Sequence, residues 1–214
     1  MRVSYFPCCY LRNFDQRYEK SLDIVCKQLG IETEEVLNWS CCGGEILERT
    51  DADGRYLLPL RNLAISEKLT KNPVFFVPSP HCFRVFARSR EWFLQASEEE
   101  RKRALEYIGL PYSGKTDVKN LLQVMEDHQA GAKIKKFLMR NLNGLKVVCY
   151  YGCKSTRPTS YVPDLGDPER IDVMERYVKM AGGEPLPFLY SQTCNGGHMA
   201  HISPQEGLRM IGNI

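Results

Sequence analysis

The stretch Trp39–Gly44, which reads WSCCGG, places two neighbouring cysteines directly before two glycines. Adjacent side chains of a strand point to opposite faces, so Cys41 and Cys42 cannot both enter one core from a regular strand. Glycine lets the backbone turn tightly at little steric cost. The pattern therefore predicts a loop on which two thiols face a common centre.

The size and charge of the chain limit its function class. With 214 residues, 43% of them hydrophobic, the chain can bury a substantial core in one large or two small domains. Its 29 basic and 26 acidic residues are intermixed and leave a net charge of +3, so we expect no nucleic-acid partner. The N-terminal sequence MRVSYFPCCY shows no secretory signal, and no apolar run is long enough for a membrane span. We therefore expect a cytoplasmic protein.

Nine cysteines are many for a chain of this length. In a reducing compartment, clustered cysteines serve more often as metal ligands or redox groups than as structural disulfides. The odd number of cysteines agrees with this interpretation.

The pattern of apolar residues predicts alternating strands and helices. Residues 3–6 predict a short strand, and apolar residues from Phe14 to Leu29 recur at helical spacing before Gly30. A helix that ends near Leu69, a buried strand at 74–77 and a helix opened by Pro80 follow. Further on, we expect a helix whose capping box joins Ser97 to Glu100, and another helix over residues 117–128.

After a turn at 141–144 the pattern starts again. Residues 145–153, LKVVCYYGC, predict a strand that ends in a cysteine, and a helix at about 169–181 leads to FLYSQTCNGG at 188–197. Superposing Cys153 on Cys9 and Cys194 on Cys41 also superposes the two glycine pairs. This internal repeat predicts an α/β fold of two similar halves, each a small sheet with flanking helices and cysteine-bearing loops. The expected domains are 1–144, with a helical insertion, and 145–214.

The first half carries four cysteines at positions suited to a common site: Cys9, Cys41, Cys42 and Cys82. Each follows a predicted strand or opens a predicted helix, where thiolates can converge and backbone amides can stabilise their charge. Four soft thiolates suit an iron-sulfur cluster or zinc.

The segments FPCC, NWSCCGG, VPSPHC, YYGCKSTRP and TCNGGHM resemble the cysteine-rich CCG domains of the B-type subunit of heterodisulfide reductase, over essentially the whole chain. The resemblance implies an iron-sulfur redox subunit that passes electrons to or from a disulfide or related sulfur substrate. It implies a 4Fe-4S cluster, cubane or noncubane, on Cys9, Cys41, Cys42 and Cys82, with Cys41 and Cys42 at the catalytic position. Partner subunits would bring flavin and ferredoxin-like electron carriers.

The chain departs from the family pattern in three places. Ser79 stands where the first cysteine of a CxxC is expected, which leaves four of the five family ligands in the first half. Asn195 replaces the second cysteine of the second CC pair, and the second CxxC would fall beyond Ile214. A second site with Cys153 and Cys194 is therefore expected to be degenerate or truncated.

Other cysteines and a second function class stay open at this point. Cys26 and Cys149 are expected to be buried apolar side chains. Cys8 stands where the family usually has glycine; it is a candidate substitute ligand, although we expect an inert thiol. His81 could bind a metal beside Cys82, but a lone histidine more often has a structural role. The alternative function is a noncatalytic zinc-binding or assembly module.

Overall fold

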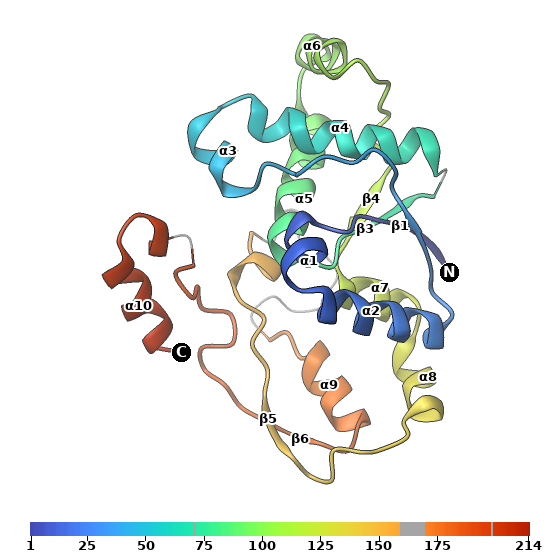
Figure 1. Cartoon of the computed structure of the whole chain (residues 1–214), viewed down its shortest axis with the longest axis vertical. Coiled ribbons are helices and arrows are strands. Elements are labelled where there is room, and N and C mark those ends of the chain that lie inside the picture. Colours follow the sequence, from blue (N-terminus) through green and yellow to red (C-terminus); the bar gives the residue numbers. More distant parts are fainter. Residues whose placement is uncertain (71, 159–169, 198) are drawn as a thin grey trace. The chain divides into compact units, whose positions relative to one another are not determined.

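A computed structural model of the chain describes residues 1–70, 72–158, 170–197 and 199–214 (Figure 1). The strands are β1 Arg2–Tyr5, β2 Glu32–Glu35, β3 Val74–Phe76, β4 Asp117–Lys119, β5 Lys146–Val148 and β6 Glu184–Leu186. The helices are α1 Cys9–Phe14, α2 Gln16–Leu29, α3 Gly44–Thr50, α4 Gly54–Leu69, α5 Pro80–Gln95, α6 Glu98–Ile108, α7 Leu121–Asp127, α8 Ala130–Phe137, α9 Val173–Met180 and α10 Pro204–Gly212. Two 3₁₀ turns are Cys153–Ser155 and Met199–His201. The chain divides into two compact units, Met1–Ala130 and Gly131–Ile214.

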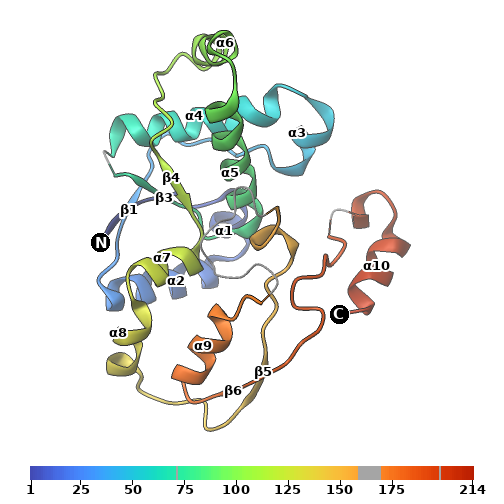
Figure 2. The same ribbon diagram turned by 180° about the vertical axis from the view of Figure 1, so that it is seen from behind.

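The first unit is built on a four-stranded sheet with the order β2-β1-β3-β4. Every neighbouring pair is parallel, and helices supply the crossovers that parallel strands require. In Figures 1 and 2, α4 lies on one side of this sheet, whereas α2 and α7 lie on the other. Because both sides are covered, consecutive residues of β1 are buried, from Val3 to Tyr5.

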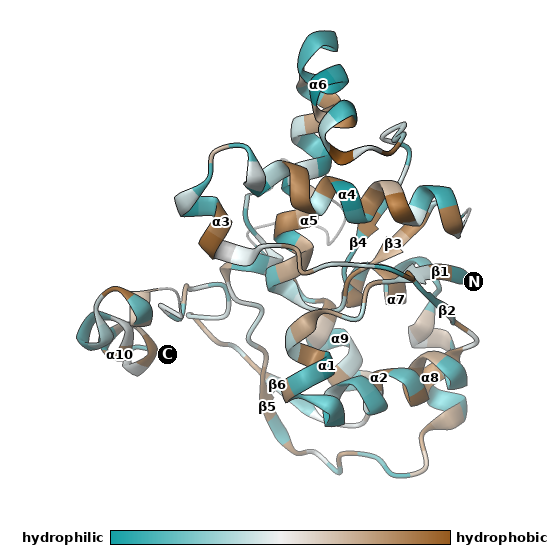
Figure 3. Cartoon of the chain, turned by 45° about the horizontal axis from the view of Figure 1, so that its top comes forward, coloured by the Kyte–Doolittle hydropathy of each residue, from teal (hydrophilic) through white to brown (hydrophobic). Residues whose placement is uncertain are grey.

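Aromatic side chains form the centre of the first unit. Phe6, Phe75 and Phe86 are fully buried, and the ring centroids of Phe6 and Phe75 lie 4.7 Å and 4.9 Å from that of Phe86. These edge-to-face contacts join the end of β1 and strand β3 to α5. Figure 3 shows hydrophobic residues gathered on α4, α5 and β3, whereas α6 is largely hydrophilic. Among the described residues, no helix is long and apolar enough to cross a bilayer.

Two helix boundaries confirm the sequence-based expectations. Helix α2 ends at Gly30, which adopts a left-handed backbone at φ 73° and whose amide reaches the carbonyls of the last turn. Helix α6 begins with a reciprocal capping box, in which Ser97 accepts from the Glu100 amide and the Glu100 carboxylate accepts from the Ser97 amide.

Three elements differ from the sequence-based expectations. The predicted helix over 117–128 is wrong at its start, because Asp117–Lys119 pairs with β3 as strand β4. Helix α7 begins only after Asn120, whose side chain caps it together with Gln123. Strand β2, with the sequence ETEE, and strand β6, with EPL, carry none of the alternating apolar pattern that identifies strands. Strand β2 is an edge strand held by backbone pairing to β1.

The second unit contains a parallel pair formed by β5 and β6, with α9 between them in sequence. The predicted helix at about 169–181 is shorter in the structure, Val173–Met180, and residue 169 lies outside the described residues. The order of strand, helix and parallel strand is also that of β1, α2 and β2. The internal repeat, and the domain limits at 1–144 and 145–214, stay predictions.

Candidate functional site: a five-cysteine group

Five cysteines lie at the carboxyl ends of neighbouring strands. Cys8 and Cys9 follow β1, Cys41 and Cys42 follow β2, and Cys82 lies in the first turn of α5 after β3. In the sheet order β2-β1-β3-β4, the chain goes from β1 to β2 on one side of β1 and then returns to β3 on the other side. The topological switch point of the sheet therefore lies between β1 and β3. Open α/β sheets bind ligands outside the carboxyl ends of strands at such a point.

The five sulfurs form one connected row. The Sγ atom of Cys82 lies 3.3 Å from that of Cys8 and 3.4 Å from that of Cys42. Cys42 is hydrogen-bonded to Cys41, whose Sγ lies 3.7 Å from that of Cys9. These separations far exceed the bond of about 2 Å in a disulfide, and all nine cysteines of the chain are free thiols. Across the described residues, no three His, Cys, Asp or Glu side chains surround the position of a single metal ion.

The row runs from the interior to the surface. Cys8, Cys42 and Cys82 are buried, Cys9 is half-buried and Cys41 is exposed. A ligand held by these thiols would therefore be shielded on the side of Cys8 and accessible on the side of Cys41.

Neighbouring donors favour the thiolate form of Cys42. Hydrogen bonds from the thiols of Cys41 and Cys82 lower the pKa of Cys42, with smaller effects from the Gly44 amide and the charge of His81. Burial opposes this shift. The thiols of Cys41 and Cys82 donate these hydrogen bonds, so their own pKa values are raised. The pKa of Cys42, at the centre of the row, is thus held below its usual range.

Cys8 is a second thiol with a lowered pKa. Its contact with Cys82 has the largest effect, and together with the amides of Leu11 and Tyr10 and the hydroxyl of Ser79 it lowers the pKa to about 6 against the effect of burial. The sequence favours an inert Cys8 and keeps it as a candidate substitute ligand; its sulfur lies in the row, beside that of Cys82, and its role stays a prediction. Two consecutive cysteines directly after a strand are the signal that could have identified it.

The glycines of WSCCGG shape the loop as the sequence predicts. Gly43 and Gly44 have φ values of 82° and 54°, in the left-handed region that favours glycine. The Gly43 amide donates to the Cys41 sulfur over 3.4 Å. A Cβ atom at Gly44 would lie 3.0 Å from Nε2 of His81, so the missing side chain lets that ring approach the loop.

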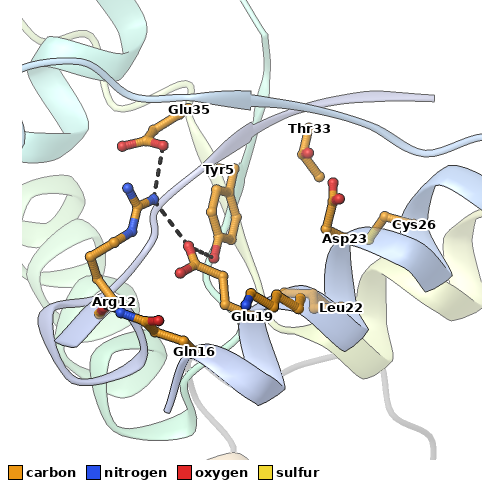
Figure 4. Close-up of a pocket in the computed structure, with 10 residues that line it drawn as sticks. Tyr5, Arg12, Gln16, Glu19, Leu22, Asp23, Cys26, Thr33 and Glu35 are labelled. Carbon is orange, nitrogen blue, oxygen red and sulfur yellow. Dashed lines mark hydrogen bonds and ion pairs between the residues drawn. The ribbon is translucent and has the colours of Figure 1, made fainter. Parts of the chain in front are cut away.

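A polar cluster supports the two loops that carry four of the cysteines (Figure 4). Tyr5 and Glu35 are paired in register at the ends of β1 and β2. Arg12 of α1 donates to Glu35 over 2.9 Å and to Glu19 over 3.0 Å, and the Tyr5 hydroxyl donates to Glu19 over 3.0 Å. These side chains line a cavity of about 460 Å³. They tie α1 and α2 to both strand ends, next to the loops that follow.

In the second unit the corresponding cysteines are held by similar local geometry. The Gly196 amide donates to the Cys194 sulfur over 3.4 Å, as the Gly43 amide does to Cys41. Cys153 opens a 3₁₀ turn after Gly152. The Tyr150 hydroxyl donates to the Thr193 carbonyl over 2.6 Å, and a Cβ atom at Gly152 would lie 3.3 Å from the same ring. Tyr150 therefore contacts the residues that directly precede Cys153 and Cys194.

Two further thiols, Cys26 and Cys149, belong neither to the row nor to the two cysteine positions of the second unit. Cys26 is 1% exposed on α2, and burial followed by the charge of Asp23 raises its pKa to about 11. Cys149 is buried and its pKa is raised, mainly by burial. Both agree with the expectation of buried apolar side chains.

Comparison with known proteins gives a family match in the first unit. Residues 3–87 match the family described as CCG, cysteine-rich domain. The chain is 28% identical to the 8-methylmenaquinol:fumarate reductase membrane anchor subunit of Wolinella succinogenes, over 99% of this chain and 72% of that protein. It is 22% identical to the B-type subunit of the ferredoxin/F(420)H(2)-dependent CoB-CoM heterodisulfide reductase of Methanosarcina acetivorans, over 98% and 70%.

A third relative, from Archaeoglobus profundus, is a protein named as similar to the B-type subunit of heterodisulfide reductase, 25% identical over 90% of this chain and 66% of that protein. The chain therefore spans between 66% and 72% of the lengths of these relatives. The match at residues 3–87 contains all five cysteines of the row. Residues 3–87 thus match the cysteine-rich CCG domain family, and most of the chain is similar to a B-type subunit and a B-like protein of heterodisulfide reductases.

Proposed function

We propose that the five-cysteine row holds an iron-sulfur cluster and that the chain is the redox subunit of a heterodisulfide-reductase-like complex. The observation that carries this proposal is the contact among five sulfurs at the switch point of a parallel sheet. Similarity to reductase subunits over most of the chain supports the same assignment.

The donor set fits such a cluster chemically. Thiolates are the ligands that iron-sulfur clusters use, and their soft sulfur atoms also suit zinc. We assign Cys9, Cys41, Cys42 and Cys82 as ligands of a 4Fe-4S cluster, cubane or noncubane. When bound, this group accepts and donates electrons one at a time.

The reaction proposed is the two-electron conversion between a disulfide and two thiols. In the reducing direction, the S–S bond of a small disulfide breaks as two electrons arrive, and each sulfur takes one proton. The electrons come from flavin or ferredoxin-like carriers of partner subunits. The substrate approaches Cys41 and Cys42 from the exposed end of the row, because the other end is buried.

Metal and sulfide analysis of protein purified without oxygen tests this proposal. We expect brown protein that contains iron and acid-labile sulfide, and a sharp loss of both in Cys41→Ser and Cys42→Ser, since a hydroxyl is a poor substitute for a thiolate. Cys26→Ser is the matched control, because this thiol is buried and makes none of the sulfur contacts of the row, and the iron content of the variant should be unchanged. Colourless protein with zinc and no sulfide would replace the proposal with the zinc-binding or assembly module.

A further inference from the structure

We propose that Cys8 supplies a fifth thiolate ligand to the cluster. This inference rests on the proposed function. It adds a ligand at a position that the family resemblance does not assign.

The contacts of Cys8 are those of a member of the site. Its Sγ atom lies 3.3 Å from that of Cys82, which is closer than Cys82 lies to Cys42 or Cys9 to Cys41. The Cys8 side chain is only 2% exposed. Cys26 is equally buried, but none of the sulfur contacts described above includes it.

The backbone gives an independent argument. Cys8 has φ 58° and ψ 129°, a region that residues other than glycine rarely adopt. In the second unit the residue before Cys153 has φ 69° and ψ 164°, and there it is Gly152. A side chain at such a position costs about 1–3 kcal/mol, and strain of this kind concentrates at functional sites. Glycine would remove the strain at Cys8, so the presence of a thiol there points to a use for the thiol.

The same strain supplies a suitable variant. Cys8→Gly removes the sulfur and at the same time gives the backbone its preferred residue, so we expect the metal-free variant to be at least as stable as the metal-free wild type. In chelator competition, we expect the affinity of the variant for iron to be lower than that of the wild type by a factor of about ten or more. Mutation of the outer-shell partners of a metal site already lowers metal affinity by this factor. The electron paramagnetic resonance spectrum of the reduced protein should also change.

Rescue makes the test specific. Ser79 is the N-cap residue of α5, three residues before Cys82, so Ser79→Cys adds a thiol beside the site. The double variant Cys8→Gly, Ser79→Cys should regain iron retention, whereas Cys8→Gly, Cys26→Ser should not. If Cys8→Gly proves unstable, Cys8→Ser keeps the side-chain size and should show the same loss of iron.

The possible results separate the two proposals. Wild-type protein without iron would overturn the proposed function itself. Iron-loaded wild type together with a Cys8→Gly or Cys8→Ser variant that keeps its iron, its sulfide and the wild-type spectrum would overturn only the role of Cys8.

Discussion

Gly43 and Gly44 perform different tasks although they are neighbours in one motif. Gly43 offers its amide to the Cys41 sulfur, and Gly44 leaves room for the His81 ring. Both adopt the left-handed backbone that favours glycine, and the side chains of Cys41 and Cys42 just before them are hydrogen-bonded to each other. On this loop, the two adjacent cysteines Cys41 and Cys42 can therefore take part in the same site.

Gly43→Ala should destabilise the first unit and weaken iron retention. A Cβ atom there adds left-handed strain of about 1–2 kcal/mol, and it would meet the Leu47 side chain at 2.3 Å. The matched control is Gly109→Ala, which has a similar φ of 66° but open space around the added atom. Urea unfolding of both variants measures the difference. An equal loss of stability in the two would mean that the contact with Leu47 relaxes without cost.

The sequence predicts four members of the row, because cysteines that follow parallel strands meet at one sheet edge. The sequence does not predict the fifth member, Cys8, from its place after a strand. Cys8 stands at a position whose positive φ is visible only in the folded backbone, and a sequence pattern treats it as a substitution of glycine. Burial of Cys26, in contrast, follows from helical periodicity alone and is confirmed.

Among the helices and strands, capping and apolar periodicity identify the helices better than the edge strands. Strand β4 continues directly into the cap of α7, so its three residues read as the first turn of that helix. Strand β2 consists of charged residues and threonine because it lies at the edge of the sheet, where side chains reach solvent. Its existence depends on backbone pairing with β1, which a local pattern does not encode.

Arg12 should couple energetically to Glu35, since it joins α1 to the end of β2 (Figure 4). Both side chains are partly exposed, so we expect a coupling of about 0.5–1 kcal/mol in a double-mutant cycle of Arg12→Ala and Glu35→Ala. Denaturant unfolding of the four proteins measures it. Lys27 and Asp23 form a more exposed pair within α2 and serve as the control, with a smaller expected coupling. Strictly additive effects for Arg12 and Glu35 would show that this ion pair does not join α1 to β2 energetically.

The alkaline stability of the protein should depend on Cys26. Burial, and then Asp23, raises the pKa of this thiol from 9.0 to about 11, so the folded state holds the proton more tightly than the unfolded state. The resulting stabilisation is complete below pH 9 and is lost as the pH rises towards 11. In Cys26→Ala, the free energy of unfolding should fall less steeply across this window than in the wild type. Parallel curves for the two proteins would show that the thiol does not titrate there.

Across the full chain, both units place cysteines after a parallel strand pair, but they differ in the number of thiols available. The first unit contributes five to one row, whereas residues 131–214 contain only Cys149, Cys153 and Cys194. Asn195 follows Cys194 where Cys42 follows Cys41 in the first unit, and the Asn195 side chain accepts a hydrogen bond from the Gly197 amide over 3.1 Å. The local cysteine geometry is thus present in the second unit without a complete set of sulfur ligands.

Cys153 and Cys194 should therefore contribute no iron site of their own. The full-length double variant Cys153→Ser, Cys194→Ser should keep the iron and sulfide content of the wild type, because four thiolates are the usual complement of such a cluster. The matched comparison is Cys41→Ser, Cys42→Ser, which removes two thiols from the row and should lose both. Cys153 and Cys194 are also candidates for a reversible disulfide, which requires their Cα atoms to lie within about 7 Å of each other. Mass spectrometry of alkylated protein before and after mild oxidation decides this: loss of alkylation at both supports a redox pair, and full alkylation rules it out. A fall in iron in the Cys153, Cys194 variant would instead place a second metal centre in residues 131–214.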